Sequence, residues 1–111
     1  MNQTHALSDV ELLVLLALIR LSPHAYGVPI AREIEVAGKR LVALSSVYAA
    51  LQRLAERGLV RSELSEARQE RGGRAKRYFQ ITGEGLREVR STQQALIGMW
   101  QGVPLLDGGK A

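Results

Sequence analysis

The sequence contains no cysteine, and this absence removes several classes of protein at once. Without thiols, the chain has no disulfide scaffold, no thiolate-ligated zinc finger and no cysteine nucleophile. Its two histidines, His5 and His24, have no carboxylate at the spacing of a metal site. No serine has an identifiable base partner. We therefore predict that the chain is not an enzyme and needs no metal or other cofactor.

Long hydrophobic runs are missing as well. The apolar run at residues 12–19 has eight residues, whereas a membrane-spanning helix needs about 20. The first residues also lack the basic segment of a secretion signal. We expect a cytoplasmic protein without a membrane partner.

The chain has the composition of an ordinary globular protein and more basic than acidic residues. It has 111 residues, 46% of them hydrophobic and 23% charged, which is typical of one folded domain. The formal net charge is +4 and the pI is about 10.0. A basic protein favours a polyanionic partner, although charge alone does not separate nucleic acid from an anionic membrane.

Three helices are predicted in the first half of the chain. A capping box of Ser8 and Glu11 begins a helix that runs to about residue 21 and is apolar on nearly every side, so it needs a cover beyond its own domain. A second helix begins near Pro29 and can close at Gly38. The remaining expectations are a short strand at 39–44, a cap at Ser45 or Ser46, and a third helix that ends before Gly58.

In the second half of the chain, the spacing of apolar residues changes from that of helices to that of strands. Residues 59–64 and 77–81 alternate as strands do, and the segment between them contains glycine, so they predict a β-hairpin. Thr82 then caps a final helix. The order of elements indicates a mainly α fold with a small β-hairpin wing: a winged helix-turn-helix plus one C-terminal helix. We place the DNA-binding domain at 8–82, a dimerisation helix at 83–101, and flexible tails at 1–7 and 102–111.

The outer face of the third helix carries small and polar side chains that suit the major groove of DNA. Gln52 could pair with adenine and Ala49 could touch a thymine methyl group, whereas flanking residues are better placed for phosphates. A solvated helix face is the alternative. The candidate contacts on this helix are Ser45, Ser46, Tyr48, Ala49, Gln52 and Arg53.

The cations of the segment "RGGRAKR" at 71–77 could bind the phosphates of a nucleotide, face solvent, or contact DNA. A nucleotide-binding P-loop needs a different spacing and a following helix, which this segment lacks. A solvated charge run remains an alternative. Its place in a hairpin beside a helix-turn-helix favours a wing that touches the minor groove or its phosphates. The candidate wing contacts are Arg71, Gly72, Gly73, Arg74, Lys76 and Arg77.

The final helix has a heptad stripe with one polar residue in it, as helices that pair with another helix do. Together with the first helix it predicts a homodimer interface formed by Leu12, Leu16, Leu86, Val89, Gln93, Leu96 and Trp100. Trp100 could simply pack in that interface, or it could line a pocket between subunits and stack on an aromatic effector.

Three stretches of the chain resemble the PadR family of bacterial transcriptional regulators, in the order that family has them. "HAYGVPIAREIE" resembles its Y-G-Y-x-I segment, "SSVYAALQRLAERGLV" its T-L-Y-P-x-L-x-R-L segment, and "GGRAKRYFQITGEG" its wing. The resemblance covers about residues 12–100. The chain resembles the short subgroup of the family, which has a single C-terminal helix.

The resemblance implies a winged-helix dimer that represses genes and releases DNA when a small aromatic compound binds. It implies that Tyr26, at the start of the second helix, lies near the DNA backbone. There are departures: Ala49 replaces the family proline, Ala75 interrupts the basic wing, and Val28 and Pro29 replace the usual Tyr-Glu pair. The first two departures fall on the expected DNA surface, so the family's operator sequence does not carry over.

These observations predict a sequence-specific, DNA-binding transcriptional regulator, a homodimer that acts as a repressor on a roughly palindromic operator in double-stranded DNA. The alternative function is a winged-helix module that binds an acidic protein partner.

Overall fold

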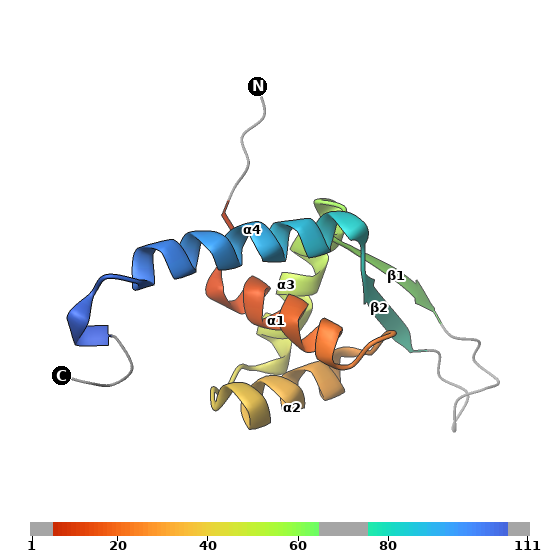
Figure 1. Cartoon of the computed structure of the whole chain (residues 1–111). Helices are drawn as coiled ribbons and strands as arrows, with labels where there is room; N and C mark the ends of the chain where they lie inside the picture. The colour runs from red at the N-terminus through yellow and green to blue at the C-terminus, as the bar shows by residue number, and fades with distance from the viewer. Residues whose placement is uncertain (1–5, 65–75, 107–111) are drawn as a thin grey trace.

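Three packed helices, a hairpin and one outlying helix make up the structure (Figure 1). The computed structural model describes residues 6–64 and 76–106. Its elements are α1 (Asp9–Arg20), α2 (Gly27–Gly38), α3 (Leu44–Glu56), β1 (Val60–Leu64), β2 (Arg77–Ile81), α4 (Gly83–Trp100) and a short 3-10 helix, η2 (Pro104–Leu106). The two strands are antiparallel, with Val60 opposite Ile81 and Leu64 opposite Arg77. The predicted winged helix-turn-helix fold is confirmed.

The hydrophobic core lies between α1, α2 and α3. Leu15 and Leu18 of α1, Ile30 of α2, and Leu51 and Leu54 of α3 are fully buried. Burying side chains of this size stabilises a fold by about 1.5–3 kcal/mol each. Because α1 packs against both other helices, it is the element through which the core and the rest of the molecule are connected.

The predicted capping box at the start of α1 is confirmed. The Glu11 N–H donates to Ser8 Oγ at 3.1 Å, and the Ser8 N–H donates to Glu11 Oε1 at 2.9 Å. These two bonds satisfy backbone donors that the first turn of a helix leaves unpaired, so the position at which α1 begins is fixed by local sequence.

The short strand predicted at 39–44 is wrong. After α2 the chain turns through Lys39, which adopts a left-handed conformation with φ 53°, and residues 40–43 run without a strand partner to α3. Gly38 is therefore the last residue of α2 rather than its left-handed cap. The sheet instead gains a one-residue extension at Ala25, which exchanges two backbone hydrogen bonds of 3.1 and 2.8 Å with Phe79.

The predicted serine cap of α3 is also wrong. The helix begins at Leu44 after Ala43, whose side chain cannot cap it, and Ser45 and Ser46 lie in the first turn. At the other end Gly58 has φ 77°, as expected, because a left-handed residue lets the Leu59 N–H reach the Leu54 carbonyl at 2.9 Å. This turn delivers the chain directly into β1.

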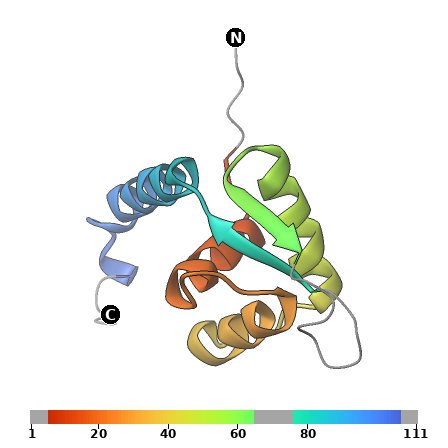
Figure 2. The same cartoon turned by 90° about the vertical axis from the view of Figure 1, so that its right-hand side faces the viewer.

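The helix α4 lies across α1, and its C-terminal half extends beyond the helical body, at the end opposite the hairpin (Figure 1). The view turned by 90° shows α4 apart from α2 and α3 (Figure 2). Thr82 caps the helix as predicted, since Thr82 Oγ1 accepts a hydrogen bond of 3.0 Å from the Gly85 N–H. Gly85 is its one buried residue, so nearly all of the apolar stripe of α4 is uncovered in a single chain.

Candidate nucleic-acid interface

The third helix presents one continuous polar face to solvent. Val47, Ala50, Leu51 and Leu54 are buried, and this fixes the rotation of α3 about its axis. The opposite side is exposed, and it carries all six residues that the sequence predicted for DNA contact: Ser45, Ser46, Tyr48, Ala49, Gln52 and Arg53. Leu44, at the start of the helix, is 40% exposed, but no bulky aliphatic side chain is exposed between Ser45 and Arg53, so the shape and polarity of this row suit a DNA groove.

Tyr48 packs against the start of α2. It is 41% exposed, and its ring covers Gly27 so closely that a Cβ on Gly27 would overlap the ring and lie 2.5 Å from the hydroxyl oxygen. Only glycine permits this approach. The tyrosine therefore joins α2 to α3 at their exposed edge, a role that its predicted phosphate contact did not include.

Arg53 is held by a carboxylate from α1. Its Nε donates to Glu11 Oε2 at 2.7 Å, and Glu11 is only 7% exposed. Burial alone would raise the pKa of Glu11, but the hydrogen bonds from Arg53 and the Ser8 N–H, with the positive charges of Arg53 and Arg57, together lower that pKa below its usual value. Glu11 is thus an ionised group that orients a candidate DNA-contacting arginine.

Aromatic rings and a lysine meet at the base of the wing. Lys76 Nζ lies 4.4 Å from the centroid of the Tyr26 ring and donates to its hydroxyl at 3.3 Å. The Tyr78 ring meets Tyr26 edge-on at a centroid distance of 5.4 Å and His24 at 5.0 Å. A cation over an aromatic face is attracted by about 0.5–2 kcal/mol. The cluster fastens β2 to the segment that leads into α2.

Sequence reasoning assigned no contact to Tyr78, and it considered His24 only as a metal ligand, a role that it rejected. The signal that could have found them is the pairing of "HAY" with "RYF". A bridge between Ala25 and Phe79 sets the flanking residues of the two segments beside each other.

The remaining wing candidates are only partly placed. Arg77 is exposed, and its guanidinium donates to Ser62 Oγ on β1 at 3.0 Å. The predicted contacts Arg71, Gly72, Gly73 and Arg74 lie outside the described residues.

A second surface is formed by α1 and α4. An open apolar hollow of about 550 Å³ is lined by Leu12, Leu16, Val89, Gln93, Leu96, Ile97, Trp100 and Gln101. Six of the seven residues predicted for the dimer interface are among them. Leu86 is exposed but does not line the hollow, and Ile97 and Gln101 were not predicted. Trp100 is 55% exposed.

Other kinds of site find little support in the part of the chain that the structure describes. Within residues 6–64 and 76–106, no three His, Cys, Asp or Glu side chains gather in a way that could hold a metal ion. No helix in the same ranges has the length and hydropathy to cross a membrane.

The family model that matches the chain decides its identity. The model for the "Transcriptional regulator PadR-like family" matches residues 15–91. The chain belongs to this family. As a PadR-like protein it is a DNA-binding transcription regulator and not an enzyme.

Solved structures agree with the family match. A PadR family transcriptional regulator from Eggerthella lenta is 29% identical, with a TM-score of 0.69 over 86% of this chain and 82% of that one. RosR from H. salinarum is 23% identical, with a TM-score of 0.65 over 91% and 84% of the two chains. A transcriptional regulator from Clostridium thermocellum, 22% identical with a TM-score of 0.69 over 81% and 82%, shares the fold. No curated protein matches the chain.

Proposed function

We propose that this PadR-like protein is a homodimeric repressor that binds a roughly palindromic operator and leaves it when a small aromatic effector binds. The observation that carries the proposal is the apolar hollow between α1 and α4, which is open in one chain and lined by most of the predicted dimer residues. Apolar surface of this kind on a small domain is typical of an interface.

Two-fold symmetry follows from pairing two identical hollows, because an isologous interface uses the same patch on both subunits. The pairing also doubles the +4 charge of one chain. Each subunit would place its α3 in one major groove, with half-site centres about one helical turn apart or a multiple of it. The wing would reach the flanking minor groove or its phosphates.

The contacts within each DNA-binding unit support specific roles. Gln52 and Ala49 lie exposed at the middle of α3, where they would read bases. Arg53, oriented by Glu11, and Tyr26, beneath Lys76, would contact phosphates. These contacts would fix the angle of α3 in the groove, and the base contacts would select the operator.

The effector site would lie in the same hollow, beside Trp100. The hollow has a volume of about 550 Å³ in a single chain, and the compound would occupy the space that the partner subunit leaves beside Trp100. Its wall is apolar and includes an indole ring on which a planar aromatic compound can stack.

Release from DNA would follow from the position of α1. This helix supplies Leu12 and Leu16 to the hollow and, one residue earlier, Glu11 to Arg53 on α3. A compound that moves α1 against α4 would change the distance between the two α3 helices of the dimer. The effect requires that the compound bind one arrangement of the dimer better than the other.

A gel-shift series over increasing salt on the chain's own promoter tests the DNA half of the proposal. Replacing Arg74 and Lys76 by Ala should weaken binding and reduce the slope of log K against log[salt] by about 0.9 for each phosphate that the wing no longer neutralises. The matched control is Arg87→Ala with Arg90→Ala, which removes the same charge from the exposed face of α4.

If the wing variant keeps both the affinity and the slope of the unaltered protein while the control does the same, the wing does not touch DNA. An unaltered protein that fails to shift any part of its promoter but binds an acidic protein would instead support the interaction module.

A further inference from the structure

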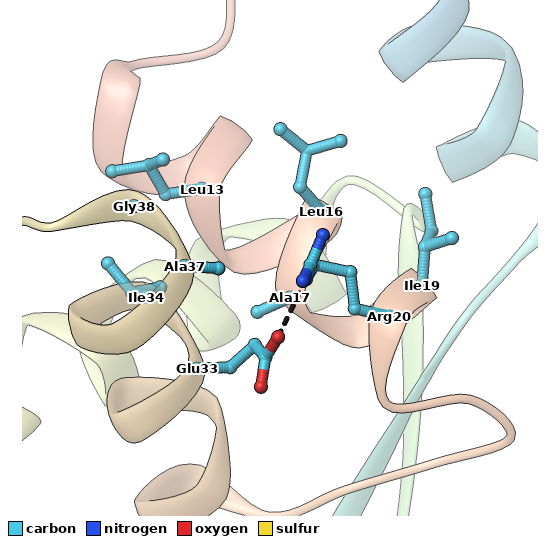
Figure 3. A pocket seen from close by; sticks show the side chains of 9 residues that line it. All are labelled: Leu13, Leu16, Ala17, Ile19, Arg20, Glu33, Ile34, Ala37 and Gly38. Carbon is cyan, nitrogen blue, oxygen red and sulfur yellow. Dashed lines mark hydrogen bonds and ion pairs between the residues drawn. The ribbon is translucent and has the colours of Figure 1, made fainter.

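A second hollow lies on the other side of α1, between it and α2 (Figure 3). It exists because the facing residues Ala17, Ala37 and Gly38 are small. Leu13 and Leu16 of α1 line it, and Arg20 Nε of α1 meets Glu33 Oε2 of α2 at 2.6 Å. We call it the α1–α2 groove. Its lining is mostly apolar and open to solvent.

The α1–α2 groove is smaller than the α1–α4 hollow. Its volume is about 260 Å³, whereas that of the α1–α4 hollow is about 550 Å³. A shallow apolar groove of this volume suits a few inserted side chains.

The two hollows are neighbours. Leu16 lines both of them, so this side chain is the ridge between the α1–α4 hollow and the α1–α2 groove. A segment that extends from the first hollow over Leu16 would reach the groove.

The chain itself carries a segment of matching chemistry. Beyond Trp100 the backbone turns at Gly102, where φ is 80°, and η2 follows. Leu105 and Leu106 in η2 are 81% and 54% exposed, and this end lies away from the helical body in Figure 1. Two adjacent leucines in water forgo the stabilisation of about 25 cal/mol per Å² that burial would give.

We propose that η2 of one subunit docks in the α1–α2 groove of its partner, with Leu105 and Leu106 seated over Ala37 and Gly38. This inference rests on the proposed dimer and adds a second, peripheral contact to it. When the α4 helices of two copies meet over the α1–α4 hollows, η2 continues past the partner's Leu16 into the groove. By symmetry the contact forms twice.

Docking there has a consequence that the α1–α4 contact alone lacks. The groove is bounded by α2, a helix of the DNA-binding unit itself, so η2 would tie the end of one subunit to the other subunit's helix-turn-helix. The spacing of the two α3 helices would then depend on both contacts.

Disulfide trapping tests the docking directly. Because the chain has no native cysteine, only the introduced cysteines can form a disulfide. One chain carries Ala37→Cys and a differently sized, tagged chain carries Leu105→Cys. Mixed and oxidised, the two should form a heterodimeric disulfide, because a disulfide requires Cα atoms within about 7 Å. Val36→Cys is the matched control: it neighbours Ala37 on α2 but is 65% exposed and does not line the groove.

The outcomes separate this inference from the proposed function. A disulfide with Ala37→Cys and not with Val36→Cys supports the docking. Sedimentation that shows a dimer, without any Ala37–Leu105 disulfide, overturns the docking and leaves the dimer. A monomer, or a dimer that survives Leu96→Asp intact, overturns the dimer interface on which both depend. A disulfide that forms only within one chain carrying both cysteines also overturns the docking.

A second measurement does not depend on disulfide geometry. Leu105→Ser with Leu106→Ser should raise the dimer dissociation constant roughly 10-fold, since two leucine side chains lose their cover. Leu41→Ser, which removes a leucine that is also 81% exposed, should leave it unchanged. Ala37→Trp should weaken the dimer similarly by filling the groove at an exposed position. Unchanged dimerisation in both the serine pair and the tryptophan variant would refute the contact.

Discussion

At the scale of single residues, the helix-turn-helix depends on the absence of one carbon atom. Gly27 has no Cβ, and the Tyr48 ring occupies the space where that atom would be. The contact sets where the exposed edge of α3 lies relative to the start of α2, the two places where DNA contact is proposed. Tyr48 therefore positions the helix that is proposed to enter the DNA groove, in addition to the DNA contact proposed for it.

Gly27→Ala should displace the Tyr48 ring and lower operator affinity about tenfold, with a loss of about 1–3 kcal/mol in the free energy of unfolding from overpacking. Gel shifts and urea unfolding measure the two effects. Gly83→Ala is the control, because nothing lies within 4 Å of the Cβ it would add. Equal behaviour of the two variants would mean that the Tyr48 contact does not matter for binding.

At the scale of elements, the sequence predicted what local chemistry decides. The caps at Ser8 and Thr82 and the turn at Gly58 were predictable because each depends on residues close together in the chain. Both strands of the hairpin were predictable from their alternating pattern on either side of a segment that contains glycine. The predicted strand at 39–44 failed because strand formation needs a partner, and the available edge of β2 is taken by Ala25.

In the candidate site too, features set by local sequence were predictable and contacts between distant residues were not. The exposed row on α3 followed from helical periodicity. The Glu11–Arg53 pair joins residues 42 apart in sequence, and no spacing rule predicts it. The Tyr26–Lys76 contact spans 50 residues and likewise depends on how the hairpin folds back.

The Glu11–Arg53 pair should make stability depend on acid. The folded state lowers the pKa of Glu11 below its ordinary value of 4.5, so the stabilisation is complete above that pH and is lost as pH falls through the folded pKa. Glu11→Gln should reduce the free energy of unfolding at pH 7 by about 1.5–3 kcal/mol, the usual contribution of hydrogen bonds to a charged group. It should also flatten the decline in stability below about pH 4.5.

Urea unfolding between pH 7 and pH 3 measures both effects. The control is Asp9→Asn, which breaks the ion pair between Asp9 and Arg40 at the surface, and exposed pairs contribute only about 0–1 kcal/mol. An acid profile that is the same in Glu11→Gln and in the unaltered protein would show that the pair contributes nothing to the pH dependence.

At the scale of the whole molecule, a single chain has a buried hydrophobic core and two apolar surfaces that are open to solvent. The core residues of α1, α2 and α3 are fully buried, whereas α4 buries only Gly85. The α1–α4 hollow and the α1–α2 groove both open to solvent along α1. A single chain therefore leaves two apolar surfaces open to solvent, and α1 is the helix shared by the core and both surfaces.

The fluorescence of Trp100 in the intact protein tests the effector hypothesis. Trp100 is the one tryptophan of the chain, so its fluorescence reports the α1–α4 hollow without interference. A planar aromatic compound that binds there should quench or shift the emission and release the operator over the same concentration range. Trp100→Leu, which keeps an apolar side chain, should still bind DNA but should no longer respond to the compound. Flat titrations across a panel of such compounds would leave Trp100 with a packing role.

The two hydrogen bonds between Ala25 and Phe79 also affect how the protein unfolds. They join the segment before α2 to β2 near the middle of the strand, and the Phe79 side chain is buried in the common core. We therefore expect the base of the hairpin to open together with the core, because separating it breaks core packing as well. Hydrogen exchange at these two amides should then follow the cooperative unfolding of the three-helix core.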